Sequence, residues 1–458
     1  MRCAVNRQAS ANEARARKFF GAAPLLIDGI EPYLRGGVSL FLGMLVAHGG
    51  AMRSNAPRDA HTQVLVVGAG PAGLLAALRL TRLGIRVRLV EQQAEPRAHS
   101  FPVLLHTRSL ELLLEAGVSA ALFWRGRPVT RLAVYTDHER RAVLDFPELP
   151  GLGAGLLTLP QDILRQALTN ALEQAGVRVE WNTRLVTLQQ DESSVWGCLS
   201  NEGSMSTSAS AQEQSTFRAD FVIGADGYDS TVRDALGLML ADDGSLLSFA
   251  FFDATTHRSG AEAQLALTRD YGNSAYPLQG GLTRFSFQLG SSLHAQPDTA
   301  ALRDLLHARM PWYASEVLSC EWAGIAEFRR ALVDHFGVGR VWLAGEAAHM
   351  TGPLGVQSLN VGLDEANELA LLISATLERG ASPTFGAQYD ARRRRQWRQL
   401  LALDEQPRIT PRSPQWVQHY LPQLESALPA SERNLDDLFT QLRLSPSAPP
   451  QGGSLASG

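Results

Sequence analysis

The ten residues Val-Leu-Val-Val-Gly-Ala-Gly-Pro-Ala-Gly, numbers 64–73, decide the fold of this 458-residue chain. The apolar run before the first glycine predicts a buried parallel strand. The residues from Ala72 to Leu83 then have helical apolar spacing, which stops at Gly84. A strand, a glycine-rich turn and a helix in this order are typical of a Rossmann-like nucleotide-binding unit.

Three glycines of this stretch have separate roles in such a turn. Gly68 would allow the tight turn itself, Gly70 would let a pyrophosphate approach the backbone, and Gly73 would let the helix pack closely on the strand. The helix starts around Pro71 and Ala72, where free N–H groups and a partial positive charge favour a phosphate. The turn is therefore a candidate dinucleotide site.

An acidic residue follows at the end of the next predicted strand. Arg86–Val90 has strand character and is followed by Glu91, which lies 18 residues after Gly73. A carboxylate at this place can bind the ribose hydroxyls of an adenosine. The complete pattern predicts a bound dinucleotide, and it does not distinguish FAD from NAD.

Two further predicted strands end in glycine-rich motifs that carry acids. Residues 221–227 are an apolar strand that runs into Gly-Ala-Asp-Gly, and residues 341–349 are an apolar strand that runs into Gly-Glu-Ala-Ala-His. Open α/β sheets bind ligands at the carboxyl ends of their strands. Asp226 and Glu346 are therefore candidate ligand contacts.

In this order and spacing, the three motifs resemble the group A flavoprotein aromatic monooxygenases, the family of para-hydroxybenzoate hydroxylase and the phenol and polyketide hydroxylases. The resemblance runs from about Gln63 to Arg398. It implies an α/β fold in which a Rossmann-like FAD-binding domain is interleaved with a β-rich substrate domain and followed by C-terminal helices. It also implies FAD as the cofactor and NADPH or NADH as the co-substrate.

The resemblance further implies which residues hold FAD. The expected cofactor-binding residues are Gly68, Gly70, Pro71, Ala72, Gly73, Glu91, Arg108, Gln161, Asp226, Arg233, Gly345, Glu346, Pro353 and Asn360. The loop expected beside the flavin ring contains Pro353, Gly355, Leu359 and Asn360. A helix starting near Asn360 would point its positive N-terminus at the flavin. The pattern identifies no catalytic acid or base.

The chain departs from the family pattern at three places. Phe101 stands where a pyrophosphate-binding arginine or lysine is expected, and Arg97 and Arg108 are the candidates to supply the missing charge. Glu346 stands in place of an aspartate. The flavin loop usually reads Gly-Gln-Gly, and here it is Val-Gln-Ser, ending at Ser358. Added side chains crowd a place where backbone meets flavin, and this crowding is expected to shift the mobility of the flavin ring. Weaker FAD binding is expected from the missing charge at Phe101.

The implied reaction is hydroxylation of an electron-rich aromatic small molecule, phenolic or polyketide-like. NAD(P)H would reduce FAD, reduced flavin would react with O2, and a C4a-hydroperoxide would transfer one oxygen atom. Two alternatives stay open, a flavin-dependent reductase or dehydrogenase of the same fold and a non-catalytic FAD-binding pathway protein. Lys18 is the only lysine, so chemistry that needs a lysine in the rest of the chain is excluded.

Composition limits the partners and the location. The net charge is −4 without an acidic tail, so no nucleic-acid partner is expected. Cys3, Cys198 and Cys320 are scattered singly, which predicts no metal site, no disulfide framework and a cytoplasmic location. The apolar stretch 38–47 is too short to span a bilayer, so no stable membrane insertion is expected. The oligomeric state is not predicted.

Composition also divides the chain. Residues 1–60 are expected to be a non-native extension, an accessory segment or a targeting segment, with Met52 as an alternative start. Residues 61–400 would form the FAD-binding monooxygenase fold, and 401–458 a helical segment with a disordered tail. The expected FAD-binding parts are approximately 61–125, 156–180, 217–240 and 335–385, and the expected substrate-domain parts are approximately 126–155, 181–216 and 241–334.

Two features of the expected substrate-domain parts lead to further predictions. Asp191–Thr216 is rich in Ser, Gln and Glu, and this composition predicts a solvated hairpin loop. Four phenylalanines alternate along the later strands and would either line a substrate site or form a core. These are Phe249, Phe251, Phe285 and Phe287.

Overall fold

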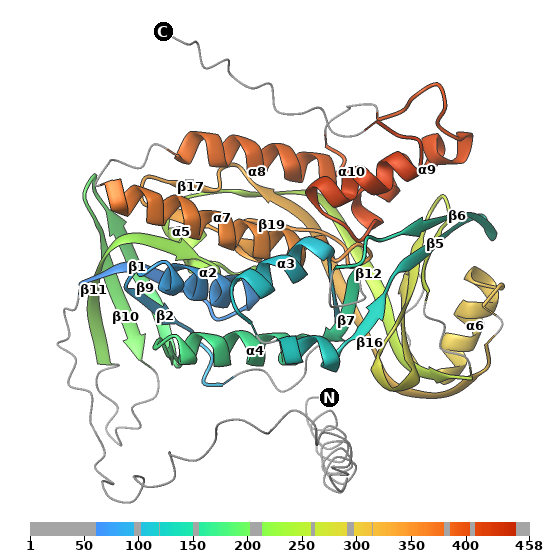
Figure 1. Cartoon of the computed structure of the whole chain (residues 1–458), viewed down its shortest axis with the longest axis horizontal. Helices are drawn as coiled ribbons and strands as arrows, with labels where there is room; N and C mark the ends of the chain where they lie inside the picture. Colours follow the sequence, from blue (N-terminus) through green and yellow to red (C-terminus); the bar gives the residue numbers. More distant parts are fainter. Residues whose placement is uncertain are drawn as a thin grey trace, which may run out of the picture. The chain divides into compact units, whose positions relative to one another are not determined.

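The structure is a computed structural model with two large sheets, a small three-stranded sheet and helices beside them (Figure 1). It describes residues 61–95, 102–118, 120–149, 155–201, 213–257, 262–290, 297–313, 315–379, 385–403 and 408–445. The predictions for residues 1–60, Arg97 and Phe101, and nearly all of the expected disordered tail, lie outside these residues. No described helix is long and apolar enough to cross a membrane.

The first sheet is mostly parallel and contains the three predicted motif strands. Its main strands, in spatial order, are β17 (Gly337–Val338), β18 (Val341–Leu343), β11 (Glu213–Gly224), β1 (His61–Val67), β2 (Val87–Val90) and β8 (Val179–Glu180). Val67 lies beside both Gly224 and Val90 in the register, and Gly224 lies beside Leu343. The carboxyl ends of β1, β2, β11 and β18 therefore share one edge of the sheet.

Helices with apolar faces cover this sheet. The predicted first helix is α2 (Pro71–Arg82), in which Leu74, Leu75 and Leu78 are fully buried. It packs against α7 and α4, which lie beside it in Figure 1. The other helices are α3 (Thr107–Glu115), α4 (Gln161–Gln174), α5 (Thr231–Ala235), α7 (Gln357–Arg379), α8 (Gly386–Leu400), α9 (Gln415–Ala427) and α10 (Glu432–Gln441), with short 3-10 turns η1 (Ala120–Arg125), η2 (Gln279–Gly281) and η3 (Gly345–Ala347).

The second sheet is the strand-rich part predicted between the motifs. Its strands, in spatial order, are β19 (His349–Met350), β16 (Val317–Val333), β12 (Leu240–Thr256), β15 (Leu282–Gln288), β14 (Gly272–Pro277), β13 (Ala263–Leu267), β5 (Arg131–Thr136) and β6 (Glu139–Asp145). Helix α6 (Thr299–Arg309) lies against it (Figure 1) and shares a hydrophobic core with Phe285 and Phe287. The third sheet joins β3 (Pro102–Leu105), β7 (Leu156–Pro160) and β4 (Arg127–Val129).

One prediction about the fold is wrong. Much of the expected loop 191–216 is strand, because β10 (Val195–Asn201) pairs antiparallel with β9 (Thr183–Gln190) and with β11. These strands extend the first sheet, so they do not belong to the substrate-domain part expected at 181–216. The Ser, Gln and Glu residues on both sides of β10 in the sequence hid the apolar alternation of Val195 and Leu199, which are buried. Residues 202–212 lie outside the described part.

Candidate active site

The three motifs meet around a cavity of about 430 Å³, which we call the dinucleotide cavity. It is lined by the glycine-rich turn at 67–70, by residues 91–93 after β2, and by the second motif at 225–229. The glycines have the roles expected of them. Gly68 has a φ of +102° and lies against the backbone of Ala225, and a Cβ on Gly73 would overlap the carbonyl oxygen of Gly68.

Gly70 differs from these two packing glycines because it faces open space. No atom lies within 4 Å of the place a Cβ would occupy. Gly70 is also the N-cap of α2, so the partial positive charge of the helix points into the cavity beside it. Pro71 begins the helix, and Ala72 packs on Gly345 of the third motif. The turn therefore leaves room for a phosphate at a helix N-terminus.

Glu91 and Asp226 present carboxylates to the same cavity. The side chain of Glu91 accepts hydrogen bonds from the backbone N–H groups of Ala69, at 2.7 Å, and Gln93, at 2.9 Å. Asp226 accepts from the hydroxyl of Ser230 at 2.6 Å, and burial raises the pKa of its carboxyl. Both acids are thus held in fixed positions at the cavity wall.

Arg233 does not line either cavity described here. Its buried guanidinium donates to the carbonyl oxygen of Ala347 at 3.3 Å and pairs with Asp234 at 3.5 Å. It therefore links the second motif to the third. The sequence predicts that Arg233 binds the cofactor. In the structure its side chain contacts the third motif instead of a cavity.

Glu346 is an exposed side chain that lines two cavities, the dinucleotide cavity and a second one of about 540 Å³. We call the second one the apolar cavity. The backbone N–H of Gly345 donates to the buried carboxylate of Glu365 at 2.9 Å. Glu365 also contacts His349 Nε2 at 2.9 Å and accepts from Trp397 Nε1 at 2.7 Å. This buried network, which the sequence did not reveal beyond His349, holds the third motif in place.

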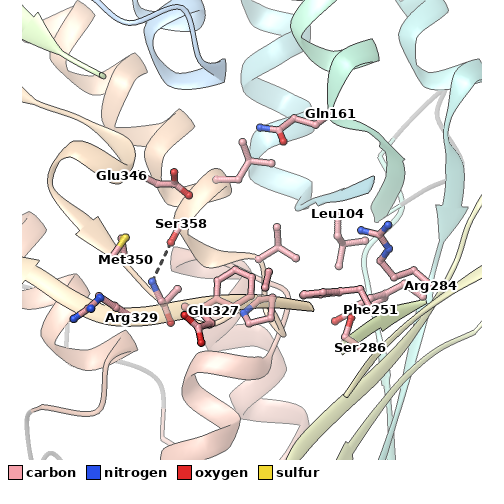
Figure 2. A pocket seen from close by; sticks show the side chains of 18 of the residues that line it. Leu104, Gln161, Phe251, Arg284, Ser286, Glu327, Arg329, Glu346, Met350 and Ser358 are labelled. Atoms are coloured by element: carbon pink, nitrogen blue, oxygen red, sulfur yellow. Dashed lines mark hydrogen bonds between the residues drawn. The ribbon is translucent and has the colours of Figure 1, made fainter. Parts of the chain in front are cut away.

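The apolar cavity lies where the loop after β19 faces the second sheet (Figure 2). Gln161 and Glu346 lie on one side of it in Figure 2, and Phe251, Arg284 and Ser286 lie on the other. From the predicted flavin loop, Pro353, Val356, Ser358 and Leu359 line the cavity, whereas Gly355 and Asn360 do not. No group of three or more His, Cys, Asp or Glu side chains in the described part of the chain could hold a metal ion.

Asn360 has a different place from the one predicted. Helix α7 begins at Gln357, one turn before it, and the Asn360 side chain is buried. Its Oδ1 accepts from the His106 N–H at 2.8 Å, and its Nδ2 donates to the carbonyl oxygens of Leu104 and Val356, both at 2.8 Å. Asn360 therefore fastens β3 and the start of α3 to the loop, while residues 356–359 meet the cavity.

The loop 351–356 is strained and strongly held. Val356 has a φ of +51°, a left-handed conformation that costs a β-branched residue free energy. The phenol of Tyr276, whose pKa burial raises, donates to the Leu354 carbonyl at 2.7 Å. Gln357 Nε2 donates to the carbonyl oxygens of Leu428, at 2.6 Å, and Ala430, at 2.9 Å. These contacts offset the strain and fix the cavity wall.

His106 also holds the loop in place, and sequence reasoning missed this residue. Burial lowers the pKa of its imidazole from 6.5 to about 3, so the ring is neutral at pH 7. A carbonyl oxygen can only accept, so Nε2 donates to Gly355 at 2.8 Å and Nδ1 accepts from the Ser431 hydroxyl at 3.2 Å. The segment before α10 is thereby tied to the loop. No signal in the sequence joins residues so far apart.

Arg108 does not lie in the dinucleotide cavity. Its guanidinium pairs with Glu111 at 3.3 Å, Asp364 at 3.5 Å and Glu115 at 3.6 Å, which ties α3 to α7. The described basic residues that do line this cavity are Arg165 on α4 and Arg184 on β9, which sequence reasoning did not single out.

Comparison with known proteins identifies the family. The FAD binding domain family matches residues 61–404 of this chain. The chain belongs to this family. The two cavities at the ends of β1, β11 and β18, which share Tyr228 and Glu346 in their linings, are therefore the candidate site of FAD.

Characterised relatives of this FAD-binding chain are hydroxylating enzymes. It is 28% identical over 322 residues to 6-methylpretetramide 4-monooxygenase from Streptomyces rimosus, covering 67% of this chain and 55% of the relative. It is 28% identical to pentachlorophenol 4-monooxygenase from Sphingobium chlorophenolicum, covering 76% of this chain and 64% of the relative. This chain thus spans just over half to about two thirds of these relatives.

Solved structures share the fold. The p-nitrophenol 4-monooxygenase PnpA from Pseudomonas putida DLL-E4 matches with a TM-score of 0.59 and 22% identity, covering 74% of this chain and 86% of that one. The α/β fold with an FAD-binding domain and an interleaved strand-rich part is therefore confirmed as a fold.

Proposed function

We propose that this chain is an FAD-dependent monooxygenase, which uses NADPH or NADH and O2 to hydroxylate an aromatic small molecule. The names of its relatives support the reaction class. The observation that carries the proposal is the position of the apolar cavity, which meets the dinucleotide cavity at Glu346 and Tyr228. An extended cofactor can thus place its nucleotide half among polar groups and its ring beside an apolar space.

The side chains present fit FAD. The open space at Gly70 suits the pyrophosphate, Glu91 suits the adenosine ribose, and Glu346 suits the ribityl chain because it touches both cavities. Gln161, Pro353 and Leu359 would lie beside the ring. Bound FAD supplies the oxygen-activating chemistry, and the protein positions the substrate and keeps water away. The N-terminus of α7 would stabilise negative charge on a reduced ring.

The opposite wall indicates the kind of substrate. Phe251 offers an aromatic face, and Arg284 and Ser286 beside it offer hydrogen-bond donors. Arg284 is held by a bidentate pair with Asp253, at 2.7 and 2.6 Å, so its charge is compensated while its orientation is fixed. This wall suits a flat aromatic ring that carries an oxygen acceptor. Hydroxylated aromatics, such as phenols, are therefore the first substrates to test.

The reducing cytoplasm is the proposed location, because Cys198 and Cys320 are free thiols.

Purified protein reconstituted with FAD tests the proposal. We expect a yellow protein whose oxidation of NADPH or NADH is stimulated by some members of a panel of phenols. Stimulated oxidation without O2, with reduction of an added carbon–carbon double bond, would identify a reductase instead. Bound FAD with no oxidation of either nicotinamide under any condition would indicate a non-catalytic FAD-binding protein.

A further inference from the structure

The dinucleotide cavity is unusually acidic for a place that would take an anion. Five of the described residues lining it are acids, namely Glu91, Glu95, Asp226, Asp229 and Glu346. Two are basic, Arg165 and Arg184. The pyrophosphate of a dinucleotide is a dianion, and the N-terminus of α2 offers only about half an elementary charge. A full cation is needed to offset repulsion from the acids.

The two arginines lie at different places along the cavity. Arg184 is the second residue of β9, and its neighbour Thr183 donates its N–H to the carbonyl oxygen of Glu91 at 2.8 Å. Arg184 therefore belongs to the adenosine end, beside the acid that suits the ribose. It is also exposed, so solvent screens its charge.

Arg165 lies nearer the middle of the cofactor path. It follows Gln161 by four residues on α4, so both side chains lie on one face of that helix. Gln161 lines the apolar cavity and Arg165 lines the dinucleotide cavity. The face is fixed because Leu164 and Leu168 are fully buried in the core. A group between the ring and the adenosine, which in FAD is the pyrophosphate, lies within this span.

We infer that Arg165 is the cation that binds the pyrophosphate of FAD in this chain. Its guanidinium is planar and can donate to two phosphate oxygens at once. It is only partly exposed, so its charge is screened less than that of Arg184. Arg165 therefore does the task for which Arg108 was a candidate from the sequence, because Arg165 lines the dinucleotide cavity and Arg108 does not.

Binding of nucleotides to Arg165→Gln tests the inference without any measurement of turnover. FAD binding is followed by its fluorescence in the FAD-free protein, and ADP and adenosine are added as competitors. We expect the dissociation constants of FAD and ADP to rise about 10- to 100-fold, the loss of one charge-assisted contact. That of adenosine should stay within about twofold, because adenosine has no phosphate. Arg165→Lys should restore part of the ADP affinity.

Matched arginine variants complete the experiment. Arg178→Gln removes the same charge from an exposed site just before β8, outside the lining of the cavity, and should bind all three ligands normally. ADP affinity should fall with salt less steeply in Arg165→Gln than in the unchanged protein. Unchanged FAD and ADP binding in Arg165→Gln overturns the inference, as does an equal loss for adenosine. So does a phosphate-dependent loss confined to Arg184→Gln. None of these outcomes bears on whether the chain hydroxylates.

Discussion

Gly70 and Gly73 lie in the same turn, yet an added methyl group would meet different surroundings at each. Gly70 faces open space and Gly73 lies against the Gly68 carbonyl. We expect Gly70→Ala to change the free energy of unfolding by less than about 1 kcal/mol and to weaken FAD binding by about 10-fold or more, since the methyl group occupies space that a phosphate needs. Gly73→Ala should lower the free energy of unfolding by about 1–3 kcal/mol through overpacking.

Urea unfolding of the FAD-free protein and FAD titration separate these two effects. Normal FAD binding by Gly70→Ala would mean that the phosphates do not approach this turn.

His106 should make stability depend on pH. Its pKa is 6.5 when unperturbed and about 3 in the folded protein, so the unfolded state binds more protons between these values. The free energy of unfolding is therefore highest above pH 6.5 and falls as the pH decreases, by about 1.4 kcal/mol per pH unit. Between pH 7.5 and 5, the loss should be about 2 kcal/mol larger than in His106→Gln. Urea unfolding at both values measures it, and equal losses would contradict the neutral buried imidazole.

The sequence predicted which residues belong to each motif better than it predicted where their side chains point. Glu91, Asp226 and Glu346 do line the dinucleotide cavity. Asn360 and Arg108, from the same predicted set, turn to other elements of the fold. Their directions depend on contacts between segments far apart in the sequence, as between Asn360 and Leu104, and a single sequence does not reveal such pairs.

Strand geometry divides the phenylalanines of the second sheet between two tasks. Phe251 on β12 lies beside Ser286 on β15, so the next residue along β15, Phe285, points to the opposite face. Phe251 lines the apolar cavity, Phe249 lines a smaller cavity next to it, and Phe285 and Phe287 belong to the core with α6. The core alternative of the sequence prediction therefore holds for Phe285 and Phe287, and Phe251 stays a candidate for the substrate site.

Replacing one phenylalanine on each face tests this division. Phe285→Leu should lower the free energy of unfolding by about 1–3 kcal/mol and leave KM for a stimulating phenol unchanged. Phe251→Leu should change that KM severalfold, because the ring faces the substrate space, with a smaller effect on unfolding. The measurements are urea unfolding and the phenol dependence of NAD(P)H oxidation. A KM that responds only to Phe285→Leu would place the substrate on the other face of the sheet.

Elements with strong local signals were predictable from the sequence, and a strand between polar segments was not. The helix α2 lies within one residue of the range predicted from Ala72 to Leu83, because apolar spacing and a following glycine mark it. Strand β10 was predicted as loop, because the Ser, Gln and Glu residues on both sides of it in the sequence are typical of loops.

At the scale of the whole molecule, distant segments complete one site. The first sheet supplies the dinucleotide cavity, the second sheet supplies the aromatic wall, and the segment before α10 holds the loop between them. His106 and Ser431, which share a hydrogen bond, are 325 residues apart in the sequence. The motifs predicted the first contribution, and the alternating phenylalanines of the part expected at 241–334 indicated the second. The third depends on tertiary packing alone.

In the proposed reaction, one oxygen atom from O2 enters an aromatic substrate at this site. The most direct measurement is mass spectrometry of the product formed by the FAD-loaded protein from NAD(P)H, a stimulating phenol and isotopically labelled O2. We predict one labelled oxygen atom per molecule of hydroxylated product, and none when the label is supplied as water. Product that carries label only from water, or NAD(P)H oxidation in which no member of the phenol panel is hydroxylated, would contradict the claim.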